Sequence, residues 1–489
     1  MTTSPQTHTP LKAALTSAIG FAALLMASAL HAQANILLIV SDDHGAADSG
    51  SYGNTEISTP NIDRLSKQGI RFNAAFTTQA ICTPSRSSLF TGLYPMRHGA
   101  HRNHTSVNED TLSLPHYFQP LGYKVYLAGK THIGPDSAFP FETLSAEGLI
   151  PFSTSITDYF RSMRDVFHSD EAFVMVVSTS LPHTPLGEHR YPDSQRYQAN
   201  NISLPPYLVD TKETRRARAG YYELVSQFDR DLGVMLQMLD DSPAADITYV
   251  IYLSDHGAGF AFEKWTNYDA GIRIPLIVRA PDRRNAGTSS DAMVSIIDVL
   301  PTMLSLAGQN QQQSIDGRSF KKLIDNPELD HRDYIFATHT TLGIRNASDA
   351  MPIRTIRNKR FKYIKNLNPE GVLTNNVTET GQSAWPSWLS AASNGNAQAQ
   401  QRISAYQSRP EEELYSLEAD PYELKNVIAN PGYAPMLANM RAALELEMAR
   451  QDDQGLKASH TESNIGFVAR LLWATQSAWQ RLRGLFSAD

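Results

Sequence analysis

Four apolar runs, each followed by polar residues, constrain the fold of this chain most strongly. Residues 35–40 read Asn-Ile-Leu-Leu-Ile-Val, a continuous apolar run typical of a strand buried on both faces of a parallel sheet. Residues 123–128, 171–178 and 247–254 have the same character. Because an open α/β sheet binds its ligands beyond the carboxyl ends of its strands, the residues that follow each run are candidate site residues.

Acidic side chains follow two of these runs. Asp42 and Asp43 come after the first, and Asp255 and His256 come after the fourth. Adjacent carboxylates repel each other unless a cation compensates, so we predict a hard divalent metal with oxygen ligands, completed by Asp255. The alternative for Asp42 and Asp43 is a solvated turn, since aspartate is common in turns on its own account.

Basic side chains follow the other two runs. Lys130 and His132 project to the same side if the backbone stays extended, which would place an ammonium and an imidazole over one pocket. Two solvated loop residues are the alternative. His183 lies between two prolines after the third run, where a lone histidine is more often structural than catalytic. Lys264 follows Asp255 in a loop that the apolar residues 274–278 close.

Cys82 is the only cysteine in 489 residues, so it forms no disulfide within the chain. It is either a small buried hydrophobic residue or a group kept for its reactivity. Pro84 disfavours helix in the residue before it, and the apolar residues after Arg86 begin a helix. We therefore expect Cys82 in a turn at a helix N-terminus, where backbone N–H groups favour anions.

Length and composition limit the class of protein. The chain is long enough for one large domain and a smaller one, and 41% hydrophobic with 19% charged residues is ordinary for a globular protein. A formal net charge of -7 argues against a nucleic-acid partner. An anionic substrate would need a local cluster of cations.

The N-terminus, residues 1–34, is typical of a signal peptide. Lys12 precedes the apolar residues 13–30, and Ala-Gln-Ala at 32–34 offers a cleavage site. A membrane anchor is the alternative, although the run is short for a stable span. Export without structural cysteines fits a periplasmic enzyme.

The pattern of residue types changes near residue 333, where we expect a smaller subdomain over 333–455. Residues 355–364 alternate apolar and basic side chains, which predicts a half-exposed strand with a solvated charged face or, alternatively, a substrate-facing basic edge. Residues 375–401 predict an irregular insertion. The tail, 456–489, permits a basic amphipathic helix that contacts a membrane surface or a partner subunit; packing on its own domain is the alternative.

The order of strand, Asp-Asp, helix, strand and Cys-x-Pro-x-Arg (82–86) resembles the type I sulfatases of the alkaline-phosphatase-like superfamily. The resemblance extends from Asn35 to about Asn430, and residues 129–135, 353–357 and 366–368 are similar to N-sulfoglucosamine sulfohydrolases, or sulfamidases. It implies an α/β fold over 35–332, with a large mixed, mostly parallel sheet flanked by helices. A C-terminal α+β subdomain built on an antiparallel sheet would follow; the chain alone leaves monomer and homodimer open.

The resemblance also implies cofactors. A formylglycine-generating or sulfatase-maturating enzyme would oxidise Cys82 to formylglycine, whose hydrated aldehyde is the nucleophile. Asp42, Asp43 and Asp255 would bind one calcium ion together with that residue. His256 stands at a position where sulfatases usually have asparagine. A histidine there is similar to the pattern in phosphonate monoester hydrolases of the superfamily. The fourth protein ligand and the metal therefore stay open.

The remaining site residues take their roles from the same resemblance. Arg86 and Lys130 would hold the nucleophile and the sulfate, while His132, His183 and Lys264 surround the developing charge and the leaving group. Lys264 keeps the charge of the arginine found in sulfamidases but not its bidentate fork. His183 is the expected acid, with Lys264 as competitor.

The activity that the resemblance implies is hydrolysis of a sulfate group from a sulfated saccharide. The leading substrate is the N-sulfate of glucosamine in heparin or heparan sulfate fragments. The alternatives are an O-sulfatase on another sulfated sugar, a phosphonate or phosphate ester hydrolase, and a glycan-binding protein in which Cys82 stays unmodified.

Overall fold

The computed structural model of the protein describes residues 33–144, 159–184, 191–310, 312, 314–344, 346–378 and 383–455. Within these residues the larger sheet has nine strands in the order β4-β3-β5-β1-β6-β8-β2-β7, with β9 beside β2. The strands are β1 (Asn35–Ser41), β2 (Ile70–Phe76), β3 (Lys124–Gly129), β4 (Glu142–Thr143), β5 (Phe173–Ser178), β6 (Thr248–Ser254), β7 (Arg273–Ile274), β8 (Leu276–Arg279) and β9 (Ser289–Ser295).

Most strands of this sheet run parallel. β1 pairs in parallel with both β5 and β6, and β3 pairs in parallel with β5. β8 runs antiparallel between β6 and β2. Every residue of β1, β5 and β6 is buried, as expected for strands covered on both faces. The predicted mixed, mostly parallel sheet is confirmed.

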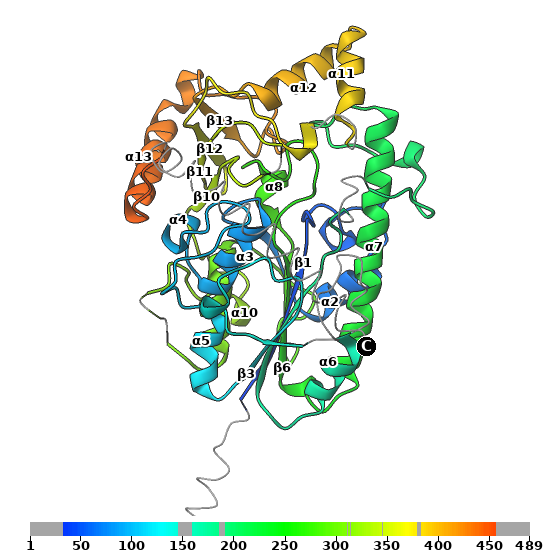
Figure 1. Ribbon diagram of the computed structural model, residues 1–489, viewed down its shortest axis with the longest axis vertical. Coiled ribbons are helices and arrows are strands. Elements are labelled where there is room, and N and C mark those ends of the chain that lie inside the picture. The colour runs from blue at the N-terminus through cyan, green and yellow to red at the C-terminus, as the bar shows by residue number, and fades with distance from the viewer. Residues whose placement is uncertain are drawn as a thin grey trace, which may run out of the picture.

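Helices cover both faces of the sheet, with α3, α5 and α10 on one side and α2, α6 and α7 on the other (Figure 1). The helices of this part are α2 (Pro60–Gln68), α3 (Cys82–Thr91), α4 (Pro95–His98), α5 (Leu114–Phe118), α6 (Phe160–Phe167), α7 (Lys212–Asp240), α8 (Asp269–Ile272), α9 (Val299–Leu306) and α10 (Lys321–Asp325). Among the described residues, none of the helices combines the length and the apolar character that a membrane crossing requires.

A second sheet of four antiparallel strands lies beyond the carboxyl ends of the large sheet's strands (Figure 1). Its strands are β10 (Ile335–His339), β11 (Ile353–Arg357), β12 (Phe361–Asn366) and β13 (Glu412–Ser416). The long helix α13 (Ala434–Arg450) packs against β11 and β12. The smaller antiparallel sheet is therefore confirmed, while the subdomain limits at 332/333 and 455/456 stay predictions.

The expected half-exposed strand at 355–364 is wrong. β11 and β12 form a hairpin around residues 358–360, where Lys359 and Arg360 are exposed. Within the strands, Arg354, Arg357 and Lys362 are buried rather than solvated. Arg354 binds Asp453, and Lys362 lies 2.6 Å from Asp269. The acidic partners lie far away in the sequence. The alternating pattern predicts a solvated strand, but these basic side chains are buried because opposite charges neutralise them.

The irregular insertion expected at 375–401 is also wrong. Those residues contribute α11 (Trp385–Ser393) and the start of α12 (Ala397–Gln407). Trp388 is buried, and its indole N–H donates to Thr214 on α7 at 2.9 Å. Tertiary packing of tryptophan thus outweighs a polar composition that favours loops.

Two further expectations concern the chain ends. The proposed signal peptide falls almost entirely on residues 1–32 and the amphipathic tail on 456–489, and both segments lie outside the described residues.

Candidate active site

The strand register brings the predicted site residues to one level at the sheet edge. Ser41 of β1 pairs with Ser254 of β6, and Ser178 of β5 pairs with both Val40 and Gly129. The next residues on three of these strands are Asp42, Asp255 and Lys130, so these side chains leave the sheet together. Gly129 is required here: its φ is +94°, and a Cβ would lie 2.0 Å from the carbonyl oxygen of Ser178.

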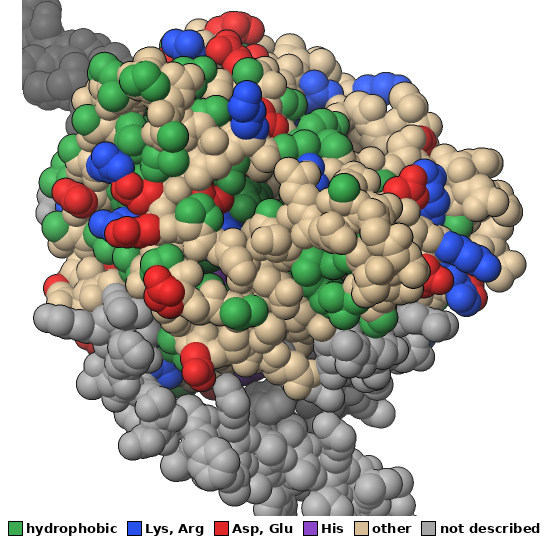
Figure 2. Space-filling view, turned by 90° about the horizontal axis from the view of Figure 1, so that it is seen from above, with side chains coloured by type: hydrophobic (Ala, Val, Ile, Leu, Met, Phe, Trp, Pro, Cys, Tyr) green, Lys and Arg blue, Asp and Glu red, His purple; other side chains and the backbone are tan. Residues whose placement is uncertain are grey.

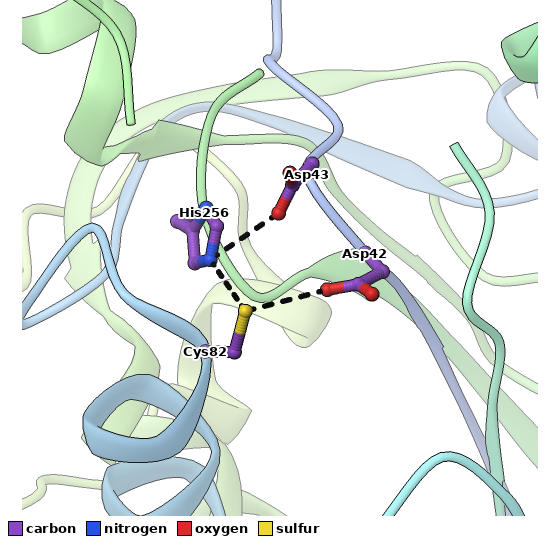
Figure 3. Close-up of side chains that lie close together, drawn as sticks. All are labelled: Asp42, Asp43, Cys82 and His256. Atoms are coloured by element: carbon purple, nitrogen blue, oxygen red, sulfur yellow. Dashed lines mark hydrogen bonds and ion pairs between the residues drawn. The ribbon is translucent and has the colours of Figure 1, made fainter. Parts of the chain in front are cut away.

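Four donor side chains converge above this edge: those of Asp42, Asp43, Cys82 and His256 (Figure 3). One atom from each lies within 4.8 Å of all the others. Cys82 is the first residue of α3, and its Sγ lies 3.7 Å from Asp42 Oδ1 and 3.4 Å from His256 Nε2. All four residues are buried, so the cluster is shielded from bulk water.

The ring of His256 is oriented toward this cluster. Its Nδ1 lies 2.9 Å from the carbonyl oxygen of Gly257, which accepts from Nδ1–H and leaves Nε2 facing Asp43 Oδ1 at 3.4 Å. Burial alone would lower the pKa of His256, but the carboxylates of Asp255 and Asp43 raise it to about 9. The cluster thus attracts positive charge.

The donor chemistry fits a divalent cation. Two carboxylates, one imidazole nitrogen and the side chain of residue 82 supply four ligand atoms of suitable type. An imidazole nitrogen in the set favours a transition metal, whereas calcium prefers oxygen ligands throughout. Calcium therefore stays a prediction.

Asp255 is turned toward Arg86 rather than into this cluster. Arg86 Nε donates to Asp255 Oδ2 at 2.9 Å, and its guanidinium also contacts Asp42 Oδ1 at 3.3 Å and the hydroxyl of Ser178. The other oxygen, Oδ1, accepts from the backbone N–H groups of Asp43 and His256. Burial raises the pKa of Asp255 to about 6. Its Oδ2 remains 3.8 Å from His256 Nε2, at the margin of the four-residue cluster.

Two lysines place positive charge beside residue 82. Lys130 Nζ lies 2.6 Å from Asp42 Oδ2, and Lys264 Nζ lies 2.8 Å from Asp43 Oδ1 and 3.6 Å from Cys82 Sγ. Burial would raise the pKa of the Cys82 thiol, but the ammonium groups of Lys130 and Lys264 lower it to about 5. An anion at the position of this side chain is therefore stabilised at neutral pH.

The structure also brings His183 to the cluster. Its Nε2 lies 3.9 Å from Asp43 Oδ2, and its Nδ1 lies 2.6 Å from the carbonyl oxygen of Thr184. That carbonyl accepts from Nδ1–H, so Nε2 is the nitrogen that can exchange a proton at the site.

His132 adopts a left-handed backbone conformation, with φ of +51°, so the extended geometry expected for residues 130–132 does not hold. Its ring contacts His104, with Nε2 of His132 2.7 Å from Nδ1 of His104. The sequence reasoning missed His104, because a single histidine in a polar loop carries no pattern that separates it from a solvated one.

The site lies below the surface of the molecule. His256 and Arg86 have no exposed area. Viewed from above, the described part of the surface shows interspersed acidic and basic side chains and only small areas of histidine (Figure 2). The charges that matter for the chemistry are thus internal.

Comparison with known proteins connects this geometry to a family. The family model described as "Sulfatase" matches residues 34–309, which hold all the site residues described above. The chain belongs to the sulfatase family. As a member of that family it is a hydrolase of sulfate esters or sulfamates. A second model, described as "N-sulphoglucosamine sulphohydrolase, C-terminal", matches residues 256–373.

Individual relatives of this sulfatase differ in their named substrates. A Formosa agariphila protein named ulvan-active sulfatase is 33% identical over 417 residues, covering 83% of this chain and 78% of its own. Human N-sulphoglucosamine sulphohydrolase is 26% identical over 452 residues, covering 84% of this chain and 89% of its own. The fold is similar to that of a phosphonate monoester hydrolase from Agrobacterium radiobacter, with a TM-score of 0.65 and 19% identity, covering 86% of this chain and 96% of that one.

Proposed function

We propose that this chain is an exported, formylglycine-dependent sulfatase that removes a sulfate group from a sulfated glycan, with the N-sulfate of glucosamine as leading substrate. One observation carries the proposal. The side chain of residue 82 lies within 3.7 Å of Asp42, His256 and the ammonium of Lys264, in surroundings that lower the pKa of the thiol to about 5. A nucleophile held there as an anion can attack sulfur.

Two groups would supply chemistry that the twenty amino acids lack. Formylglycine at position 82 would provide a hydrated aldehyde, with one hydroxyl for attack on sulfur and a second for release of sulfate. A divalent cation, which Asp42, Asp43, His256 and residue 82 would hold, would stabilise negative charge at the site.

The chain's own cations take up the remaining charge. Lys130 and Lys264 each neutralise one of the adjacent carboxylates and lie beside residue 82. Arg86 binds both Asp42 and Asp255 and so holds the two acidic strand ends in register. With the carboxylates neutralised, a negatively charged sulfate group can enter a buried acidic site.

Proton transfer to the leaving atom falls to His183 in this proposal. Its Nδ1–H is engaged by the carbonyl of Thr184, and its Nε2 faces Asp43 at 3.9 Å. A departing amine must gain a proton as the N–S bond breaks, and an imidazolium whose Nε2 faces the site can supply it.

Support for the N-sulfate comes from the C-terminal model match over residues 256–373 and from the human relative named for that substrate. A second candidate, an O-sulfate on another polysaccharide, is favoured by the relative named ulvan-active sulfatase, which has the higher identity. A phosphonate or phosphate ester is the third, favoured by His256 in the metal cluster.

The test is turnover of a defined panel by protein matured in its native host. The panel contains heparin disaccharides that differ only in N-, 2-O- and 6-O-sulfation, sulfated ulvan oligosaccharides, and a phosphonate monoester. We expect the largest kcat/KM on the disaccharide with a non-reducing N-sulfate, and none with Cys82→Ala. Preference for ulvan fragments or for the phosphonate would transfer the assignment to the corresponding candidate.

Mass spectrometry of the peptide carrying residue 82 tests the modification separately. A mass equal to that of unmodified cysteine in active protein would contradict the formylglycine. Export is tested by the N-terminus of the protein recovered from its host: we expect it near Asn35, and a full-length chain retained inside the cell would contradict the proposal.

A further inference from the structure

Helix α7 carries a buried arginine behind the site that the roles above do not use. Arg218 is 3% exposed, and its guanidinium binds two buried carboxylates. Nη2 contacts Asp48, in the loop after β1, and Nη1 donates to Oε1 of Glu263 at 3.1 Å. Asp43 lies in the same loop as Asp48, and Lys264 directly follows Glu263. One side chain therefore joins the two loops that carry Asp43 and Lys264.

The surroundings of Arg218 fix the orientation of its guanidinium. The rings of Tyr221, Tyr222 and Phe260 lie around it, with its Cζ 5.1, 5.4 and 5.0 Å from their centroids. Burial disfavours the charged form, but the two carboxylates hold the pKa of Arg218 well above its usual range. A planar fork that stacks on aromatic rings and binds two carboxylates has a geometry that the ammonium of a lysine lacks.

Tyr221 ties the same helix to the backbone of the loop after β1. It follows Arg218 by three residues, so both side chains lie on one face of α7. Its hydroxyl oxygen lies 3.2 Å from the carbonyl oxygen of Asp43 and 3.1 Å from Oδ2 of Asp48. The same oxygen accepts from the backbone N–H of Gly45 at 3.3 Å. The loop is therefore held through its backbone as well as through Asp48.

Both loops contain strained backbone. Asp43 adopts a left-handed conformation with φ of +65°, and Phe262 and Trp265, on either side of residues 263 and 264, have φ of +67° and +62°. Bulky side chains rarely occupy this region, because Cβ comes too close to the backbone. Such residues keep this conformation only where the surrounding structure holds them. The contacts from α7 supply that support at both loops.

The two loops meet at an ion pair inside the site. Lys264 Nζ lies 2.8 Å from Oδ1 and 2.9 Å from Oδ2 of Asp43. We propose that Arg218 and Tyr221 are positioning residues, which clamp the two strained loops to α7. The clamp keeps Asp43 facing the four-residue cluster and Lys264 beside residue 82. The inference rests on the proposed function, since it concerns the same site.

Binding of Mn²⁺ to the metal-depleted, matured full-length chain tests the clamp without turnover. Arg218→Lys keeps a cation, but its shorter side chain with one nitrogen loses the fixed fork between the two carboxylates. Isothermal titration calorimetry should give a dissociation constant about tenfold or more above that of the wild type, because residues that orient metal ligands contribute about this much to affinity. Tyr221→Phe keeps the ring beside Arg218 and removes the hydroxyl, so we expect a smaller rise. An unchanged dissociation constant in Arg218→Lys would overturn the proposal.

Arg216→Lys is the matched control on the same helix. Arg216 pairs with Asp193, but the two side chains are 51% and 53% exposed, so the dissociation constant for Mn²⁺ should not change. A rise equal to that of Arg218→Lys would overturn the specific role of Arg218.

A double variant separates loss of position from loss of stability. Arg218→Met leaves Asp48 and Glu263 without the cation that they share, so the protein should unfold at a lower urea concentration. Adding Glu263→Gln removes one buried charge and should recover part of that stability, while the weaker Mn²⁺ binding should persist. Recovery of Mn²⁺ affinity in parallel with stability would overturn the positioning role. If Arg218→Met does not fold, the titrations of Arg218→Lys and Tyr221→Phe decide.

Turnover tests the position of Lys264. At saturating Mn²⁺, with the best saccharide of the panel, we expect Arg218→Lys to lower kcat by about tenfold and Arg216→Lys to leave it unchanged. An unchanged kcat in Arg218→Lys would overturn the positioning of Lys264. Failure of the wild-type enzyme on N-sulfated saccharides alone would refute the substrate assignment, and the Mn²⁺ titrations would still decide the clamp.

Discussion

Replacing Lys362 with methionine should destabilise the protein strongly, because this buried lysine links the smaller sheet to α8 and the loop before it. Lys362 lies on β12 and has no exposed area. Its Nζ donates to the carbonyl oxygen of Asn267 at 3.0 Å and pairs with Asp269 at 2.6 Å and Glu423 at 2.8 Å. Asn267 and Asp269 follow Lys264, so the ammonium also anchors the loop that carries a site residue.

The magnitude follows from what the substitution leaves behind. Methionine keeps the length of the side chain but leaves the buried carboxylate of Glu423 without its cation, while Asp269 keeps Arg357 at 3.3 Å. Removing one partner of a buried ion pair costs about 3–5 kcal/mol. Burial raises the pKa of Glu423 to about 7 even with Lys362 present, so protonation relieves part of the cost at low pH. We expect about 3 kcal/mol at pH 6 and more at pH 8.5.

Equilibrium urea unfolding, followed by far-ultraviolet circular dichroism, measures this loss. The matched control is Lys359→Met, in the same subdomain: that lysine pairs with Asp330, but the two side chains are 52% and 81% exposed. An exposed pair contributes at most about 1 kcal/mol. Adding Glu423→Gln to Lys362→Met should recover part of the stability. Equal losses in the two lysine variants would refute the reasoning.

Three further predictions concern the site and Glu263, the residue before Lys264. Burial raises the pKa of Glu263 from 4.5 to about 7, so its contribution to stability is lost as pH rises between these values, and Glu263→Gln should flatten that part of a thermal-unfolding profile. An unchanged profile would contradict the raised pKa of Glu263. Lys264→Arg should keep more activity than Lys264→Met, since a cation remains beside Asp43; equal losses would contradict the view that the charge of Lys264 decides its role. In metal-depleted protein, His256→Asn should shift reactivation from manganese toward calcium, and an unaltered preference would contradict ligation by the imidazole.

The fold was predictable where the signal is local. Buried parallel strands read as continuous apolar runs, so residues 35–40 and 247–254 could be recognised directly, and their polar ends marked the functional edge of the sheet. The cysteine motif was recognisable because the helix that begins at Cys82 depends on neighbouring residues. The resemblance to sulfatases followed from the order of these local elements.

The predictions were wrong where residues distant in the sequence determine the local structure. The sequence around Lys362 predicts a solvated side chain. In the structure Lys362 is buried and pairs with Asp269 and Glu423, which lie elsewhere in the chain. The composition of residues 375–401 predicts an irregular segment, but residues 385–393 form a helix because two tryptophans reach the core. The composition of a short segment holds no information about what packs against it.

The same division applies to the active site. The amino-acid sequence by itself determined which groups carry the chemistry: the acidic strand ends, the lysines, the histidines and Cys82. Only the tertiary structure decided how they are used, turning Asp255 toward Arg86 and placing His104 against His132, 28 residues away in the chain. The physical reason is that charges and protons respond to distances of a few ångströms, which arise only when strands far apart in the sequence pair in one register.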